Sequence, residues 1–263
     1  MENKKEYHIL SLSGGKDSTA LAFFMKENMP EIFDKLELVF YDTGCDLVET
    51  YDYLNKIEVF LNKKITYVKP QKSFEDILNE TKMIPNVFKR WCTYELKIKP
   101  SNGFLKNKIA KENIDKIKIY IGIRADEQYR TGVQLKSAFE KEYIEPVYPF
   151  INNGIVKQDV ENILINSGIN YPDYYKWRQR NGCFFCPYQS PYSWIMLYEN
   201  HPKLFYKAME YEKIGDIGKT KVFSFHPNMT LEEILKNKEC IKEKELNKKT
   251  KKTDVIKLIG AFD

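Results

Sequence analysis

The sequence lacks any hydrophobic run long enough to span a membrane, and its first six residues contain no apolar segment typical of an export signal. We therefore expect a cytoplasmic protein with no membrane partner. Histidine is scarce, at three residues, and cysteine is limited to five in a chain of 263. Few cysteines in a chain without an export signal are more typical of metal ligands or reactive thiols than of a disulfide framework.

Charge is unevenly distributed along the chain. Residues 236–252 contain eight Lys and three Glu, which matches the whole net charge of +5, so the remainder is close to neutral. A Lys- and Glu-rich end is typical of a solvated helix or a frayed tail, and less often of an arm for a polyanion. We expect residues 236–263 to form a separate C-terminal segment.

Short apolar runs alternate with helical periodicity through the first half of the chain. Five strands are expected, near residues 7–12, 36–44, 64–68, 117–123 and 145–150, the last at an edge because of its prolines. This alternation predicts an α/β fold with a parallel, Rossmann-like sheet and right-handed crossovers. From about residue 154 the pattern is helical, which predicts an α/β domain at 1–153 and a helical, metal-binding subdomain packed on it at 154–235.

The stretch ILSLSGGKDSTALAFF, residues 9–24, passes from a strand pattern to a helix pattern through two glycines. At such a turn the unpaired backbone N–H groups and the helix dipole favour an anion, most often phosphate. Gly14 and Gly15 would let the backbone approach it closely. Further donors would be Ser13, Lys16 and Ser18. The alternatives are a plain helix cap assisted by Asp17, or a Walker-type loop, whose spacing is absent here.

Two more polar stretches, residues 42–44 and 124–130, follow predicted strands. Ligands of open parallel sheets bind beyond the carboxyl ends of the strands. The three polar stretches should therefore converge on one site, which favours the phosphate loop over the plain cap.

The cysteines suggest a second site. Cys183 and Cys186 form a C-x-x-C pair followed by proline, a spacing that suits one metal centre, a redox dithiol or coincidence. Cys92 stands among four cations, Lys89, Arg90, Lys97 and Lys99, which favour a thiolate and also suit phosphate or sulfate. For Cys92 alone, a buried apolar role is the simpler interpretation.

The order of motifs resembles the phosphoadenylyl-sulfate (PAPS) reductase-like family of the PP-loop ATP pyrophosphatase superfamily, also called adenine nucleotide alpha hydrolases. The motifs are SGGKDS, YDTG followed by Glu49 and Thr50, RWCTYELKIKP, GIRADEQYR and GCFFCP, spread over roughly residues 7–188. The resemblance implies an adenine nucleotide such as ATP as cofactor. Its implied binding residues are Ser11, Ser13, Gly14, Gly15, Lys16, Asp17, Ser18, Asp42, Thr43, Gly122 and Arg124. The implied catalytic residues are Lys16, Asp17, Arg124 and Arg130.

The resemblance also implies metals. Magnesium would be held by Asp17 or Asp42. Iron–sulfur members of the family use a pair of adjacent cysteines and a later C-x-x-C to hold a [4Fe–4S] cluster, whereas here Trp91 and Cys92 stand where the pair would be. Cys92, Cys183 and Cys186 would then leave one iron open, as in related enzymes that thiolate tRNA bases. Zinc is the alternative, although His8, His201 and His226 lie in no ligand-like motif and Cys45 reads as an ordinary loop cysteine.

Reductases of the family carry a nucleophilic cysteine in an E-C-G-[LI]-H motif, of which this chain keeps Glu239 and Cys240 but has Ile241 and Lys242 in place of Gly and His. Three hypotheses follow. The first is an ATP-dependent sulfur transferase that adenylates its substrate, with a nucleic-acid sulfur acceptor and a cysteine desulfurase as sulfur donor. The second is a sulfonucleotide reductase that uses Cys240, and the third is a non-catalytic nucleotide-binding module with a structural metal. A homo-oligomer stays open.

Overall fold

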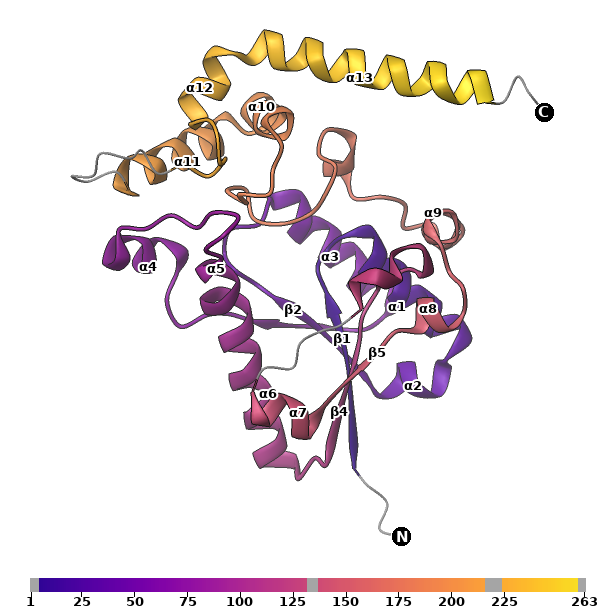
Figure 1. Ribbon diagram of the computed structural model, residues 1–263. Helices are drawn as coiled ribbons and strands as arrows, with labels where there is room; N and C mark the ends of the chain where they lie inside the picture. The colour runs from indigo at the N-terminus through magenta and orange to yellow at the C-terminus, as the bar shows by residue number, and fades with distance from the viewer. Residues whose placement is uncertain (1–4, 132–136, 216–223, 260–263) are drawn as a thin grey trace. The chain divides into compact units, whose positions relative to one another are not determined.

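Five parallel strands form one sheet in the computed structural model, which describes residues 5–131, 137–215 and 224–259 (Figure 1). The strand order is β3-β2-β1-β4-β5. The strands are β1 (Glu6–Leu12), β2 (Leu36–Tyr41), β3 (Ile65–Val68), β4 (Lys116–Tyr120) and β5 (Ile144–Val147). The expected α/β class is confirmed, and the proline-containing β5 lies at the edge, where the missing N–H of Pro146 costs least.

The strands are apolar on both faces, as expected for a parallel sheet covered by helices on each side. In β1 the side chains of Leu10 and Leu12 belong to one buried cluster, and Ile9, which precedes Leu10, belongs to another. Val39 and Leu38 in β2 divide in the same way. The sheet is therefore the middle of three layers.

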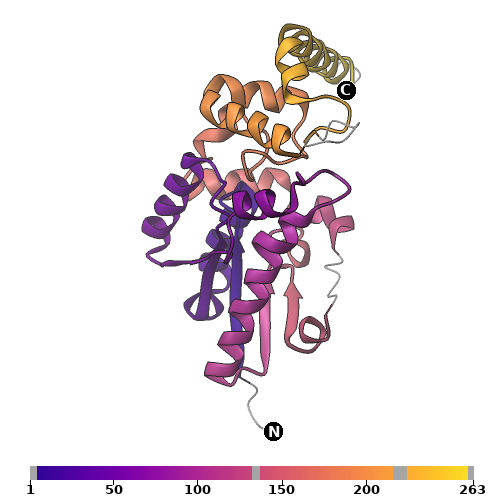
Figure 2. The same ribbon diagram turned by 90° about the vertical axis from the view of Figure 1, so that its left-hand side faces the viewer.

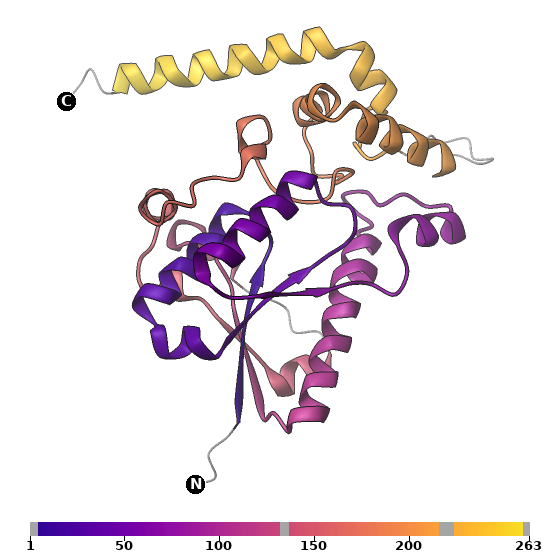
Figure 3. The ribbon, with the colours of Figure 1, turned by 180° about the vertical axis from the view of Figure 1, so that it is seen from behind.

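Helices α1 (Lys16–Asn28), α3 (Val48–Leu61) and α9 (Lys157–Asn166) supply the first cluster, and α6 (Lys99–Glu112) supplies the second. Figure 1 shows α6 and α7 (Ala138–Tyr143) on one side of the sheet and α1 and α3 on the other. Figure 2 places α6 toward the viewer, and Figure 3 shows the same layers from behind. Short helical elements complete this part: α2 (Pro30–Lys35), η2 (Ala125–Arg130), α8 (Pro149–Asn152) and η3 (Asp173–Lys176).

The chain divides into two units whose limits differ from the expected boundary at residue 153. The sheet unit contains residues 1–73, 92–176 and 180–183, and the helical unit contains 74–91, 177–179 and 184–263. Helix α9 belongs to the sheet unit because Val160 and Leu164 pack in the cluster that α1 also lines. Residues 74–91 belong to the helical unit because Phe74 stacks on Phe185 and contacts Tyr211.

The helical unit is built around aromatic side chains. Its helices are α4 (Phe74–Thr81), α10 (Pro191–Asn200), α11 (Pro202–Gly215), α12 (Leu231–Lys236) and α13 (Lys238–Ile259). Trp194 and Phe205 pack edge to face and are both fully buried. The Lys-rich C-terminal segment forms most of α13 and is helical through residue 259. Residues 260–263 lie outside the described part. Among the described residues, we find no helix whose length and hydropathy would let it cross a membrane.

Candidate functional site

The turn between β1 and α1 is tightly packed against its surroundings. Gly14 has φ of 73°, a left-handed conformation that L side chains rarely adopt, and a Cβ there would lie 2.7 Å from Cγ2 of Thr50. Gly15 is the residue before the first turn of α1 and has extended backbone. Gly14 is therefore required by conformation and space, whereas a Cβ on Gly15 would lie 3.1 Å from Ser13 Oγ, a hydroxyl that could move aside.

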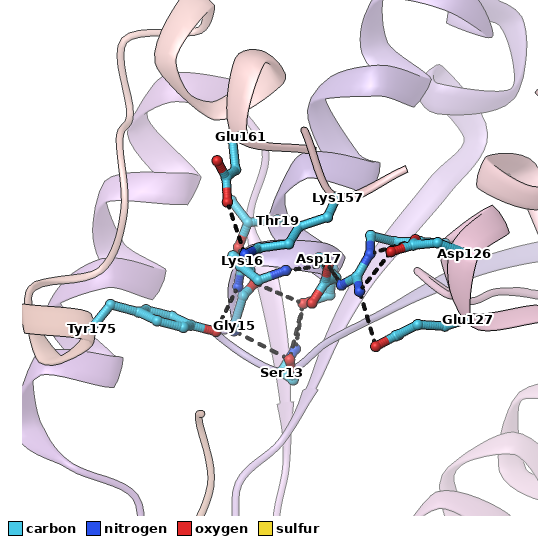
Figure 4. A network of polar contacts seen from close by, with 12 residues as sticks. Ser13, Gly15, Lys16, Asp17, Thr19, Asp126, Glu127, Lys157, Glu161 and Tyr175 are labelled. Atoms are coloured by element: carbon cyan, nitrogen blue, oxygen red, sulfur yellow. Dashed lines mark hydrogen bonds and ion pairs between the residues drawn. The ribbon is translucent and has the colours of Figure 1, made fainter. Parts of the chain in front are cut away.

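Three backbone N–H groups of this turn donate to hydroxyl oxygens (Figure 4). Ser13 N donates to Ser18 Oγ at 3.1 Å, Gly15 N to Ser13 Oγ at 3.2 Å, and Lys16 N to the Tyr175 hydroxyl at 3.4 Å. These hydroxyls are mobile acceptors that an anion's oxygens could replace, in contrast to the fixed carbonyls of a helix. The turn thus has the hydrogen-bonding character of an anion site.

Side chains from residues 174–181 hold the carbonyl groups of the same turn. The Tyr174 hydroxyl donates to Gly14 O at 2.6 Å, and the Asn181 amide donates to Ser13 O. Thr50 in turn donates to Asn181 Oδ1 at 3.2 Å. No motif in the sequence indicates these roles for Tyr174, Tyr175 and Asn181. Their only signals were the aromatic cluster at residues 171–177 and the position of Asn181 just before the first C-x-x-C cysteine.

Lys16, Asp17 and Arg124 form one charged network. Asp17 Oδ1 lies 2.6 Å from Lys16 Nζ and 2.8 Å from Arg124 Nη1 (Figure 4). Arg124 is 8% exposed and also pairs with Asp126 at 2.9 Å and Glu127 at 3.0 Å. Arg124 is thus surrounded by carboxylates, which suits it to orient Asp17.

The contacts of this network shift the pKa values of Arg124 and Asp126. Burial disfavours the charged Arg124, but hydrogen bonds to Asp126 and Asp17 outweigh burial and raise the pKa of Arg124. The hydrogen bond from Arg124 lowers the pKa of Asp126. Arg124 therefore stays a cation, and Asp126 stays an anion well below neutral pH.

The loop after β4 contacts the first turn of α1 directly. A Cβ on Gly122 would lie 2.9 Å from the carbonyl oxygen of Asp17 and 3.2 Å from Ser18 N. Only a residue without a side chain fits between these two backbones without a shift. Two of the three expected polar stretches thus meet at the carboxyl ends of β1 and β4.

A cavity of about 440 Å³ lies beside these strand ends. Its polar lining includes Ser11, Ser13, Asp17, Ser18, Tyr41, Ser101 and Arg130, and its other lining residues are Gly122, Ile119, Ile121, Ile123, Ile144 and Pro146. This volume is in the range of small-molecule sites, and apolar walls beside a polar loop suit a ligand with a flat ring and an anionic end. Of the expected binding residues, Gly14, Gly15, Lys16, Asp42, Thr43 and Arg124 are not among those lining it.

The turn after β2 is the third expected stretch, and its carboxylate is already bonded. Asp42 is 5% exposed, and its Oδ1 accepts hydrogen bonds from the Tyr51 hydroxyl at 2.6 Å and from Gly44 N at 2.8 Å. Burial, followed by the bond to Asp42, raises the pKa of Tyr51. Thr43 Oγ1 lies 3.3 Å from Cys183 Sγ. This turn therefore meets the first cysteine of the C-x-x-C pair.

In the helical unit, the residues beside two of the cysteines pack together. Trp91, which precedes Cys92, and Phe185, which precedes Cys186, both stack on Phe74, with ring centroids 5.2 and 3.8 Å away. The Tyr188 hydroxyl donates to Val87 O at 3.1 Å. Ring stacking and a hydrogen bond therefore hold together two segments almost 100 positions apart in the chain, residues 87–91 and 185–188.

The cysteine thiols themselves make no preassembled metal site. Cys92, Cys183 and Cys186 are each partly exposed, and in the described part of the chain no three Cys, His, Asp or Glu side chains converge as metal ligands. The thiols are suitable donors for an iron–sulfur cluster, but binding would have to draw them together. Cys45 is buried, whereas Cys240 is exposed in the first turn of α13.

Known proteins are similar to this chain in sequence over most of its length. The family model of the phosphoadenosine phosphosulfate reductase domain matches residues 7–222. An uncharacterized protein of Methanocaldococcus jannaschii is 26% identical over 248 residues, which are 91% of this chain and 58% of that protein. The chain therefore spans a little more than half the length of this relative.

Two solved structures are also similar. PAPS reductase from Candida auris in complex with phosphate superimposes with a TM-score of 0.49 and 14% identity, covering 69% of this chain and 82% of that chain. The U34-tRNA thiolase NcsA from Methanococcus maripaludis with its [4Fe–4S] cluster gives a TM-score of 0.42 and 18% identity, covering 89% and 81%. Because the family model covers far more than half of the sequence, the chain belongs to the phosphoadenosine phosphosulfate reductase domain family, as its motifs predicted.

Proposed function

We propose that this protein binds ATP, or a related adenine nucleotide, in the cavity beside β1 and β4 and uses it for ATP-dependent sulfur transfer. The observation that carries the proposal is the junction of this cavity with the glycine turn, where three N–H groups face replaceable hydroxyl oxygens. Ile119, Ile121 and Pro146 suit an adenine ring, and the turn suits its phosphates.

The proposed reaction begins with adenylation. An oxygen of the acceptor attacks the α-phosphorus of ATP, the new P–O bond forms, and pyrophosphate leaves with the electron pair of the broken bond. Sulfide then attacks the activated carbon, the carbon–sulfur bond forms, and the carbon–oxygen bond breaks as AMP leaves. Persulfide sulfur from a desulfurase would first be reduced to sulfide by two electrons from an external thiol reductant. Lys16 and Arg130 would stabilise the charge on the phosphates, and Asp17, which lines the cavity, would hold Mg²⁺. Arg124 would position Asp17. Asp42 fits the magnesium role less well, because it does not line the cavity and its Oδ1 accepts hydrogen bonds within the β2 turn.

Cys92, Cys183 and Cys186 are the proposed ligands of a [4Fe–4S] cluster. Three thiolates would leave one iron open to bind sulfide, which is the chemistry that the cluster would supply. The packing of Trp91 and Phe185 on one ring supports this ligand set. Zinc is the alternative, because thiolates also bind it and a fourth ligand would complete a tetrahedral site.

The proposed partners are the adenine nucleotide, a nucleic-acid sulfur acceptor and a cysteine desulfurase as sulfur donor. A soluble, cytoplasmic enzyme would meet all three. Self-association into a homo-oligomer would need its own measurement, by sedimentation.

A sulfonucleotide reductase is the second candidate, because the chain belongs to a family named for this activity and retains Glu239 and Cys240. Such an enzyme needs a mobile, exposed thiol. Cys240 is exposed, but it is fixed in the first turn of α13, where Ile241 N donates to Asn237 O and Lys242 pairs with Glu199. This geometry favours the transferase. A binding module without turnover, the third candidate, would not need the charged groups beside the turn.

Two assays on one anaerobic preparation separate the candidates. The first measures pyrophosphate release from ATP with RNA or DNA acceptors, and the second measures thioredoxin-dependent sulfite release from adenylylated sulfate. Acceptor-stimulated pyrophosphate release that survives Cys240→Ser and fails in Cys183→Ser supports the transferase. Sulfite release that Cys240→Ser abolishes would establish the reductase instead. Nucleotide binding without either product would identify a binding module.

A further inference from the structure

Phe88 is 91% exposed, more than any other large hydrophobic side chain among the described residues. It lies in the turn between α4 and α5 (Trp91–Thr93), within the helical unit. A ring this exposed contributes almost nothing to the stability of the fold, because it buries almost no apolar surface. Its exposure leaves the ring accessible to a partner outside the chain.

The turn that carries Phe88 is rigidly built. Asn86 Oδ1 accepts hydrogen bonds from Phe88 N at 2.9 Å and from Lys89 N at 2.8 Å. Trp91 Nε1 donates to Met83 O at 3.0 Å and ties the two ends of the turn together. The ring is thus held outward on ordered backbone, which lowers the entropic cost of binding a partner.

Two cations follow Phe88 directly in the chain, and a second ring contacts one of them. Lys89 and Arg90 are exposed, and neither forms an ion pair with any described residue. The Arg90 guanidinium lies 4.9 Å from the centroid of the Tyr188 ring, which is 41% exposed. Residues 81–91 contain three cations and no Asp or Glu. We call Phe88, Lys89, Arg90 and Tyr188 the Phe88 platform.

We infer that the Phe88 platform binds an unpaired nucleic-acid strand, with a base stacked on Phe88 and phosphates held by Lys89 and Arg90. Aromatic rings flanked by cations are the common means of binding single strands, because every base has a flat face and every linkage carries a negative charge. An acidic protein would pair with the cations but would offer a flat partner only where it exposes an aromatic side chain, whereas every nucleotide carries both a flat base and a charged phosphate. A second copy of the same cationic platform would be repelled.

The platform adjoins the cysteines along the chain. Arg90 stands two positions before Cys92, and Tyr188 stands two positions after Cys186. The contacts of Tyr188 with Arg90 and Val87 bring these two flanks together within the helical unit. The platform is thus built from the segments of the chain that lead into Cys92 and out of Cys186, two of the residues proposed to carry the sulfur chemistry. The inference rests on the proposed function in this one respect, that the sulfur acceptor is a nucleic acid.

Fluorescence anisotropy with labelled 12-nucleotide single strands tests the inference on the full chain. Phe88→Ala should weaken binding by about five- to a hundredfold, the cost of losing one stacked base, whereas Phe88→Trp should retain it. Lys89→Gln should lower the slope of log K against log salt by about 0.7 to 1. Tyr206→Ala is the matched control, since Tyr206 is a 47% exposed ring on α11, and it should bind as the wild type does.

RNA strands, DNA strands and a duplex of the same sequence form the arms of the experiment. Tighter binding of either single strand than of the duplex supports the inference and identifies the acceptor class. Equal strand affinity of Phe88→Ala and the wild type would overturn the inference. If Phe88→Ala also sedimented differently from the wild type, the ring would be part of a protein contact instead. Calorimetry with ATP on Phe88→Ala should match the wild type. If the wild type does not bind ATP, the proposed nucleotide site is refuted but the Phe88 platform is not.

Discussion

The hydroxyl of Tyr175 lies 3.4 Å from the backbone nitrogen of Lys16, 159 positions earlier in the chain. It accepts the hydrogen bond of an N–H group at the start of α1, where the helix dipole favours an anion. The same hydroxyl would lie 3.6 Å from a Cβ on Gly15, so it sits directly over the turn. Tyr175 therefore occupies a position that an oxygen of a bound phosphate would take.

Removing this hydroxyl should strengthen anion binding. In Tyr175→Phe the Lys16 N–H loses its acceptor, and the ligand no longer has to displace it, so pyrophosphate should bind about two- to tenfold more tightly. The free energy of unfolding should fall by about 1 kcal/mol for the lost hydrogen bond. Titration calorimetry and urea unfolding measure the two effects.

Tyr171→Phe is the control for this variant. Tyr171 contacts the Tyr175 ring edge to face, at 5.7 Å between centroids, but its hydroxyl is not bonded to the turn. Its pyrophosphate affinity should equal that of the wild type. Weaker binding by Tyr175→Phe alone would mean that the hydroxyl is a ligand of the phosphate and not its competitor.

A methyl group at Gly122 should disturb the turn without touching any charged side chain. Its Cβ would meet the Asp17 carbonyl oxygen at 2.9 Å, so Gly122→Ala should lower the free energy of unfolding by about 1 to 3 kcal/mol and weaken ATP binding as α1 shifts. Gly103→Ala, in α6 with no atom within 4 Å of its Cβ, should instead gain up to about 1 kcal/mol and bind ATP normally. Equal behaviour of the two variants in urea unfolding and calorimetry would contradict the close contact.

The fold and the core of the site could be predicted because their signals are local. Alternating apolar runs specify strands, and Ser13 to Ser18 specify a strand, turn and helix within a few residues. The pairs that complete the site are not local. Nothing in the sequence near Lys16 indicates that a tyrosine 159 positions away will accept its N–H. Likewise, nothing in the sequence indicates that three carboxylates, from Asp17, Asp126 and Glu127, will surround Arg124.

The division of the chain was also beyond local signals. Residues 74–91 lie between β3 and α6 in the chain, within the part expected to form the α/β domain. The ring of Phe74 finds its partners Phe185 and Tyr211 more than 100 positions later. Side-chain packing of this kind depends on the assembled fold, so hydrophobic periodicity alone does not reveal it.

Glu212 should make the stability of the protein pH-dependent. Its carboxylate accepts hydrogen bonds from Phe225 N and Leu231 N, both at 2.9 Å. Burial raises its pKa to about 7, against the partial opposition of these two bonds. A carboxyl whose pKa is higher in the folded state contributes most stability below its unfolded pKa of about 4.5, and that contribution is lost as the pH rises through 7.

The loss should reach about 3 kcal/mol by pH 8, from a shift of about 2.5 units at 1.36 kcal/mol each. Glu212→Gln cannot ionise, so its free energy of unfolding in urea should be flatter between pH 5 and 8 than that of the wild type. Glu210→Gln, an exposed neighbour on α11, should keep the wild-type profile. Parallel profiles for Glu212→Gln and the wild type would show that this carboxyl is already ionised at pH 5.

Three of the five cysteines should be needed for iron and the other two should not. Anaerobically reconstituted wild-type protein should be brown and bind about four iron atoms, because these are the colour and the iron content of one [4Fe–4S] cluster. Cys92→Ser, Cys183→Ser and Cys186→Ser should each lose most of the iron. Cys45→Ser and Cys240→Ser, which change a buried and an exposed thiol outside the ligand set, should keep it. Iron and sulfide analysis with the visible absorption spectrum measures the outcome. A colourless protein with one zinc would contradict the cluster, and retention of iron by Cys92→Ser would leave only the C-x-x-C pair as ligands.

A hydrogen bond to a ligand sulfur tunes an iron–sulfur cluster, and Thr43 Oγ1 lies 3.3 Å from Cys183 Sγ. Thr43→Val should therefore keep the iron but shift the visible absorption bands of the reconstituted protein.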